Sequence, residues 1–75
     1  MEIQEKFGLV IRKLRRQKHV SQEKFALDAG IDRTYIGDIE NGSRNISLQM
    51  IEKIADYFGI QISEIFKQIE DEQLT

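Results

Sequence analysis

Hydrophobic residues recur every three or four positions along most of the chain, which is the spacing of a helix that buries one side. Near the start, this pattern predicts a helix from about Glu2 to Lys18. The apolar stripe of this helix consists of Ile3, Phe7, Val10, Ile11 and Leu14. His19 follows, and we expect it in the turn after the helix because histidine is enriched at positive φ.

Three further helix starts share one signature, in which a capping Ser or Asp has an apolar residue just before it and another four residues after it. These groups are Val20-Ser21 with Phe25, Ile31-Asp32 with Ile36, and Ile46-Ser47 with Ile51. Each predicted helix ends at a glycine, so the helices cover residues 22–29, 33–41 and 48–58. A fifth helix, over about residues 63–72, would bury Ile65, Phe66 and Ile69. The pattern therefore predicts an all-α fold.

Length and composition limit what this fold can do. A chain of 75 residues makes one small domain, residues 1–75, with little room for a separate sensing or catalytic unit. It has no Cys and one His, so we expect no disulfide, no metal site, no cofactor and no nucleophile-base pair of an enzyme. No apolar run approaches about 18 residues, so we expect no membrane span. A chain without Cys suits the reducing cytoplasm, and without a sensing unit we expect no small-molecule ligand.

Charge is unevenly distributed although the net charge is only −2. Residues 6–44 carry nine basic side chains against five acidic ones, whereas the segment from Ser47 onward carries two against six. A mixed solvated surface would also show such variation. A basic half is nevertheless compatible with a nucleic-acid partner, since the distribution of charge matters more than its sum.

The segments 22–29 and 33–41 have the plan of a helix-turn-helix, covering about residues 21–41. Ala26 offers a small side chain where the helices cross, and Gly30 tolerates the turn. Ile36 and Ile39 would face inward. The opposite side of the second helix then presents Thr34, Gly37 and Asp38, with Arg33 and Tyr35 on its flanks.

These residues resemble the phage-repressor (Cro/XRE-type) helix-turn-helix domains over about residues 7–66. The resemblance is carried by Leu14-Arg15, Ser21-Gln22-Glu23, Ala26, Gly30, Ile36 and Ile39-Glu40-Asn41-Gly42. Within that family, residues 32–36 and 43–47 look most like the controller proteins of restriction-modification systems. The resemblance implies a compact, five-helix, lambda-repressor-like fold and a transcriptional regulator that binds double-stranded DNA.

The resemblance also implies which residues contact DNA. Gln22 matches a residue that holds a phosphate, and Arg33, Thr34 and Tyr35 match the head of the recognition helix. The full set is Gln22, Arg33, Thr34, Tyr35, Gly37, Asp38, Ser43, Arg44 and Asn45. For Gln22 and Arg44 a purely solvated position is the alternative, and for Tyr35 a packing role.

Two acidic residues of the third helix receive different expectations. Glu40 matches a family position that pairs with Arg15, so the resemblance implies a partly buried structural salt bridge between them. Asp38 would be repelled by phosphates, and it would be useful only by accepting a hydrogen bond from cytosine N4 or by orienting Arg33.

A domain of this size makes few base contacts, so we expect a homodimer on a palindromic operator. The expected dimer residues are Ile62, Ile65, Phe66 and Ile69, with Leu74 as a further candidate. The controller resemblance implies regulation by protein concentration, with RNA polymerase as a partner during activation. The alternatives are a phage-type repressor and an antitoxin whose main partner is a protein.

Overall fold

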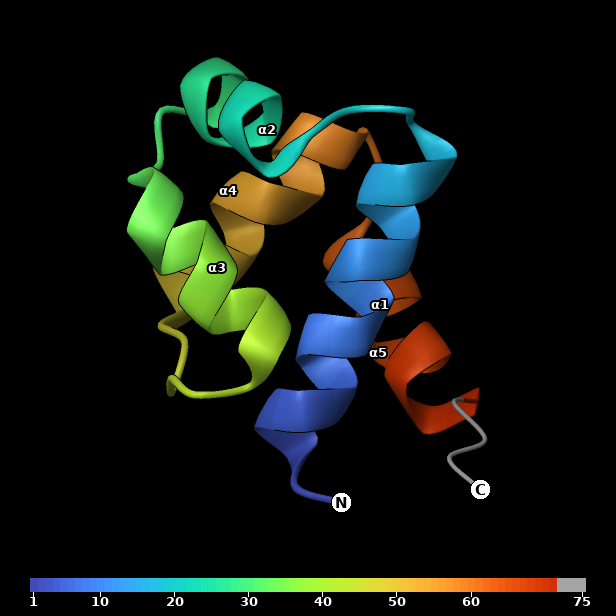
Figure 1. Cartoon of the computed structure of the whole chain (residues 1–75). Coiled ribbons are helices and arrows are strands. Elements are labelled where there is room, and N and C mark those ends of the chain that lie inside the picture. The colour runs from blue at the N-terminus through green and yellow to red at the C-terminus, as the bar shows by residue number, and fades with distance from the viewer. Residues whose placement is uncertain (72–75) are drawn as a thin grey trace.

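The computed structural model describes residues 1–71, which form five α-helices and no strand. They are α1 (Ile3–Gln17), α2 (Gln22–Ala29), α3 (Arg33–Asn41), α4 (Leu48–Phe58) and α5 (Ile62–Asp71). As Figure 1 shows, α1 packs against both α3 and α5, while α2 packs against α3 and α4. Among these helices, none is both long and apolar enough to cross a membrane.

The three predicted capping residues each begin a helix. Ser21 Oγ accepts a hydrogen bond of 3.0 Å from the backbone N–H of Lys24, at the start of α2. Asp32 Oδ1 accepts one of 2.8 Å from Thr34, at the start of α3. At α4, Ser47 Oγ accepts one of 3.1 Å from the backbone N–H of Met50. The bounds predicted for α2, α3 and α4 are confirmed.

The turn after α1 agrees with the sequence-based expectation, whereas the start of the last helix differs from it by one residue. His19 has a φ of 60°, which confirms its predicted place in the turn after α1. The last helix begins at Ile62 rather than at residue 63, because Gln61 C=O already accepts a hydrogen bond of 3.0 Å from Glu64 N–H. Position 72 of the predicted helix and the candidate dimer residue Leu74 lie outside the described residues.

One core joins all five helices. Its buried hydrophobic residues are Phe7, Val10, Ile11, Leu14, Phe25, Ala26, Ile31, Ile36, Ile39, Ile51, Ile54, Ala55, Ile65 and Ile69. The expectation that Ile3 belongs to the buried stripe of α1 is wrong, since this residue is 59% exposed. Ile3 lies in the first turn of α1, at the rim of an apolar hollow that it shares with Phe7 and Phe66.

A glycine sets the distance between α1 and α3. A Cβ added at Gly8 would lie 2.4 Å from the carbonyl oxygen of Ile39 and 2.8 Å from that of Glu40. No side chain fits at such distances, so Gly8 allows the two helix backbones to pack directly against each other. This close contact fixes the position of α3, the helix that carries most of the candidate DNA-binding residues.

Candidate nucleic-acid interface

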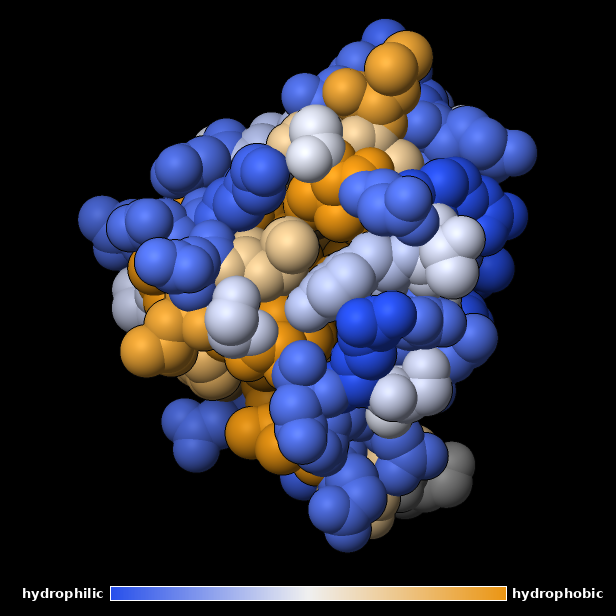
Figure 2. Space-filling view, turned by 90° about the vertical axis from the view of Figure 1, so that its left-hand side faces the viewer, coloured by the Kyte–Doolittle hydropathy of each residue, from blue (hydrophilic) through white to orange (hydrophobic). Residues whose placement is uncertain are grey.

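Helix α3 is anchored on one side and open on the other. Ile36 and Ile39 on its inner side are completely buried, and Ile31 anchors the turn that leads into it. Arg33 and Thr34 at its beginning are exposed, while Gly37 and Asp38 further along are half-buried. In Figure 2, hydrophilic residues gather on the right-hand side of the molecule. This side corresponds to the front of Figure 1, where α3 lies.

The head of α3 presents an exposed basic side chain on a capped backbone. Asp32 caps the helix, so the backbone of Arg33 and Thr34 is held in place. Arg33 Nε lies 3.9 Å from Glu23 Oε1 of α2, and both side chains are mostly exposed. An exposed ion pair of this length is weak. The guanidinium of Arg33 can therefore leave Glu23 for a ligand at little cost.

Asp38, Arg44 and Tyr35 form a second group on the same side of the molecule. Arg44 Nε donates a hydrogen bond of 2.9 Å to Asp38 Oδ2, and its guanidinium carbon lies 4.4 Å from the centre of the Tyr35 ring. The suggestion that Asp38 orients Arg33 is therefore wrong for this structure, because the carboxylate pairs with Arg44. Tyr35 is half-buried and packs against the core, which agrees with the packing role, and its DNA contact stays a prediction.

The loop between α3 and α4 is tied to α3 and to α1. Ser43 Oγ donates a hydrogen bond of 3.2 Å to the backbone carbonyl of Asp38. Asn45 Oδ1 accepts a hydrogen bond from Gln4 Nε2 of α1. Ser43, Arg44 and Asn45 all remain exposed. The loop is thus held beside α3 with its side chains accessible from outside.

The ion pair that the sequence predicts between Arg15 and Glu40 is present. Arg15 Nε lies 2.7 Å from Glu40 Oε2, and its Nη2 lies 3.0 Å from Oε1. The Glu40 side chain is completely buried. Arg15 also donates a hydrogen bond of 2.9 Å to the carbonyl of Val20, which joins the turn before α2 to this pair.

Two further donors share the Glu40 carboxylate. Gln22 Nε2 donates a hydrogen bond of 3.1 Å to Oε1, and Arg12 Nε lies 3.4 Å from the same atom. Burial by itself would raise the pKa of Glu40. The hydrogen bonds from Arg15, Gln22 and Arg12, together with the charge of Arg15, outweigh it and lower that pKa below its ordinary value.

The structure thus places the predicted DNA-contact residues around α3 but connects them differently from the expectation. Gln22 is not simply solvated, because its amide is bonded to the buried Glu40. The sequence analysis did not identify Arg12 as a partner of Glu40. A signal existed in the sequence: Arg12 and Arg15 are three residues apart on one helix, which puts their side chains near each other.

The predicted dimer residues divide into two kinds. Ile65 and Ile69 lie in the core of the single chain, with 0% and 4% exposure, so they have no surface to offer a second copy. The expectation that these two make the dimer contact is corrected. Ile62 is 39% exposed and Phe66 is half-buried. Leu48 at the start of α4, which the sequence analysis did not single out, is 80% exposed and lines a hollow with Ile62.

Comparison with known proteins agrees with this arrangement of helices. A model of a family described as helix-turn-helix matches residues 11–65, which include α2, α3 and the turn between them. The chain belongs to the helix-turn-helix family. The control protein C.MunI from Mycoplasma sp is 49% identical to this chain, over 95% of this chain and 97% of its own length.

Solved structures show that the helices of this chain are also arranged as in controller proteins. The restriction-modification controller protein C.AhdI from Aeromonas hydrophila is 44% identical, with a TM-score of 0.80 over 84% of this chain and 96% of that one. The controller protein C.Esp1396I, solved as a tetramer with its natural 35 base-pair operator, is 31% identical with a TM-score of 0.85. That match covers 95% of this chain and 93% of C.Esp1396I.

Proposed function

We propose that this protein is a transcriptional regulator, not an enzyme, that binds double-stranded DNA in a sequence-specific manner in the cytoplasm. The observation that carries the proposal is α3 itself: a capped helix with a buried inner side and exposed side chains at its beginning. Helices of this kind enter the major groove with their first residues against the base edges. The similarity to C.Esp1396I, which has been solved with its operator, supports the same use here.

Each residue of the interface then has a chemical role. Arg33 reads guanine through its O6 and N7 atoms, because a guanidinium can donate two parallel hydrogen bonds to them. Thr34 and Tyr35 contact a base edge, a thymine methyl group or a phosphate. Gln22 donates to a phosphate from the beginning of α2, where backbone N–H groups also face outward.

The remaining interface residues surround this centre. Ser43, Arg44 and Asn45 face the DNA backbone from the loop after α3. Arg44 is held against Asp38 and the Tyr35 ring before DNA arrives, which reduces the freedom it loses on binding. At Gly37, between these residues, the outward side of α3 carries no side chain.

Two variants test these roles together. Arg33→Ala is expected to weaken binding to the preferred duplex by about 1–3 kcal/mol and to relax the preference at one base position. Gln22→Ala is expected to weaken binding to preferred and random duplexes by similar factors. Fluorescence anisotropy titrations on both duplexes measure the two effects. If both variants lose affinity for both duplexes in the same proportion, the division into base and phosphate contacts is wrong.

We further propose that the protein acts as a homodimer through α4 and α5. Leu48, Ile62 and Phe66 supply hydrophobic surface there, next to the apolar hollow at the start of α1. Two copies related by a two-fold axis would place their α3 helices about 34–36 Å apart, in successive major grooves on one side of the duplex. The operator would then be roughly palindromic.

Sedimentation of two matched variants tests the dimer surface. Leu48 and Leu27 are equally exposed, at 80% and 79%, but Leu27 lies on α2, away from α5. Leu48→Asp is expected to sediment as a monomer, whereas wild-type protein and Leu27→Asp sediment as dimers. A Leu48→Asp variant that dimerises as strongly as wild type would contradict the proposed surface.

The biological role that the relatives support is control of a restriction-modification system. C.MunI and C.AhdI are both controller proteins, and C.MunI matches nearly the whole chain. In this role the protein activates transcription at low concentration, in contact with RNA polymerase, and represses its own promoter at high concentration. A reporter gene behind the operator, measured while protein expression is raised stepwise, should first rise and then fall. Repression at every concentration would favour a simple repressor.

A further inference from the structure

Arg12 lies on α1, outside the helix-turn-helix, yet it contacts the end of α3. Its Nε is 3.4 Å from Glu40 Oε1, and its Nη2 is 3.5 Å from the backbone carbonyl oxygen of Glu40. The Arg12 side chain is 34% exposed. Arg12 Nε and Nη2 are therefore held by Glu40, while part of the side chain remains accessible to solvent.

The charges around Glu40 do not balance. One buried carboxylate faces the guanidinium groups of both Arg12 and Arg15. Arg15 makes the shorter contact, at 2.7 Å, and its side chain is only 13% exposed. The surplus positive charge therefore belongs to Arg12, which is the more exposed of the two and makes the longer contact.

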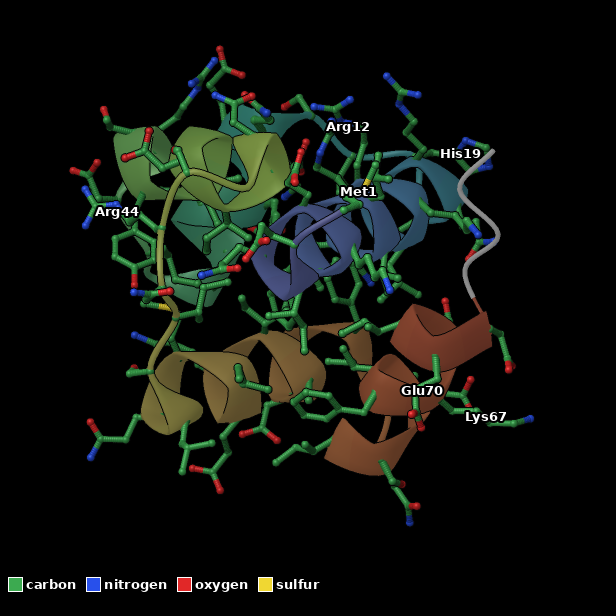
Figure 3. The ribbon with its side chains drawn as sticks, turned by 90° about the horizontal axis from the view of Figure 1, so that it is seen from below. Met1, Arg12, His19, Arg44, Lys67 and Glu70 are labelled. Carbon is green, nitrogen blue, oxygen red and sulfur yellow. The ribbon has the colours of Figure 1, made fainter. Side chains whose placement is uncertain are left out.

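Arg12 is also close to a residue that faces DNA in the proposed function. Gln22 donates to the same carboxylate oxygen, Glu40 Oε1, and begins α2. In Figure 3, Arg12 lies near the top of the molecule and Arg44 at the left-hand edge, both in the upper half, whereas Lys67 lies beside α5 at the lower right. The same side of the protein thus carries Arg12 and a residue of the α3–α4 loop.

We propose that Arg12 binds a DNA phosphate beside Gln22, so that α1 adds a backbone contact to those made by α2, α3 and the loop. Glu40 acts as the positioning residue for both donors. A guanidinium suits this task because it presents several N–H donors and keeps its charge at any physiological pH. The proposal rests on the proposed DNA-binding function.

The salt dependence of binding gives the most direct test. Arg12→Gln and the control Lys67→Gln both replace one cation by a neutral amide of similar size. Each phosphate contact contributes about 0.9 to the slope of log affinity against log salt concentration. For each bound subunit, Arg12→Gln is expected to lower that slope by about 0.9, and its affinity deficit is expected to shrink by about 3.5-fold between 50 and 200 mM salt.

Two further readouts separate a phosphate contact from a purely structural role. Arg12→Gln is expected to weaken binding to operator and random duplexes by the same factor, and Arg12→Lys is expected to restore most of the salt slope. Lys67→Gln should keep the wild-type slope. An unchanged slope in Arg12→Gln, or a loss restricted to the operator, would overturn the proposal while leaving the proposed function intact. Absence of wild-type binding to any duplex at low salt would overturn both.

Discussion

The inner and outer sides of α3 use charged residues in opposite ways. On the inner side, Glu40 is completely buried and receives hydrogen bonds from two other helices. On the outer side, Asp38 and Arg44 form a pair whose side chains are 32% and 46% exposed. A buried pair is costly to break, whereas an exposed pair contributes little to stability. We therefore expect substitutions on the inner side of α3 to lower the stability of the fold, and substitutions on its outer side to weaken DNA binding.

The largest effect on the free energy of unfolding is expected when one partner of the buried Arg15–Glu40 pair is removed. Arg15→Met leaves the Glu40 carboxylate without its main partner and removes the bond to the Val20 carbonyl. Unfolding in urea should show a loss of about 3–5 kcal/mol. The double variant Arg15→Met with Glu40→Leu should be more stable than Arg15→Met, since it contains no buried carboxylate that has lost its main partner. A loss under about 1 kcal/mol in Arg15→Met would contradict the architectural role.

Acid should remove the contribution of the Glu40 carboxylate to the stability of the fold. The pKa of Glu40 is lower in the folded protein than in the unfolded chain, where it is about 4.3. Its stabilising effect is therefore fully present above that value and is lost as pH falls through the folded-state pKa. The difference in unfolding free energy between wild type and Glu40→Gln should be constant from pH 7 to about pH 5 and should shrink below pH 4. A difference that stays constant down to pH 3 would show that Glu40 is not the titrating group.

Gly8 on α1, facing α3, and Gly37 on the outer side of α3 allow the same comparison at positions without charge. Gly8→Ala would place a Cβ 2.4 Å from the carbonyl oxygen of Ile39, so α1 and α3 would have to move apart, at a cost of about 1–3 kcal/mol. At Gly37 the nearest atom would be Arg33 Nη1, 3.4 Å away on a flexible side chain. Gly37→Ala should therefore raise stability by up to about 1 kcal/mol.

Binding of the stabilised variant then shows what Gly37 is for. If α3 approaches DNA closely at this position, Gly37→Ala weakens operator binding although the protein melts at a higher temperature. Thermal unfolding and anisotropy titration of the same preparation give both values. An alanine variant that is more stable and binds as well as wild type would mean that Gly37 has no part in the contact.

The smallest effect on stability is expected from the outer pair. Asp38→Asn should change the free energy of unfolding by less than about 1 kcal/mol, because both partners are partly solvated. Its effect on DNA should be larger than its effect on folding, since Arg44 loses the group that holds it over the Tyr35 ring. Comparing urea unfolding with operator binding for this variant measures both. A greater loss in folding than in binding would contradict the distinction between the two sides.

The helices were predictable because their signals are local. Ser21, Asp32 and Ser47 cap helices by bonding to residues two or three positions away, and αL glycines end them. The α1–α3 contact at Gly8 was not predictable in this way, because it depends on how two helices distant in the sequence cross. A helical glycine looks the same in the sequence whether its Cβ position is blocked, as in Gly8, or open, as in Gly37.

The candidate interface was predictable as a set of residues but not as a set of contacts. The helical period places Thr34, Gly37 and Asp38 on the outer side of α3 with Arg33 on its flank, and in the structure Thr34 and Arg33 are exposed while Gly37 and Asp38 are half-buried. Which acid pairs with which base depends on side-chain positions in three dimensions, so the sequence offers Arg33 as one possible partner of Asp38, whereas the structure pairs Asp38 with Arg44. Ile65 and Ile69 show the same difficulty, because an apolar stripe does not reveal whether the core or a second copy covers it.

Selection of bound sequences from a random duplex library, carried out at two salt concentrations, tests the central claim most directly. The account predicts a palindromic motif whose half-sites lie about one helical turn apart, with affinity that falls steeply as salt rises. Salt-dependent binding without any motif would contradict sequence-specific recognition by α3. Absence of binding at low salt would contradict the regulator function altogether.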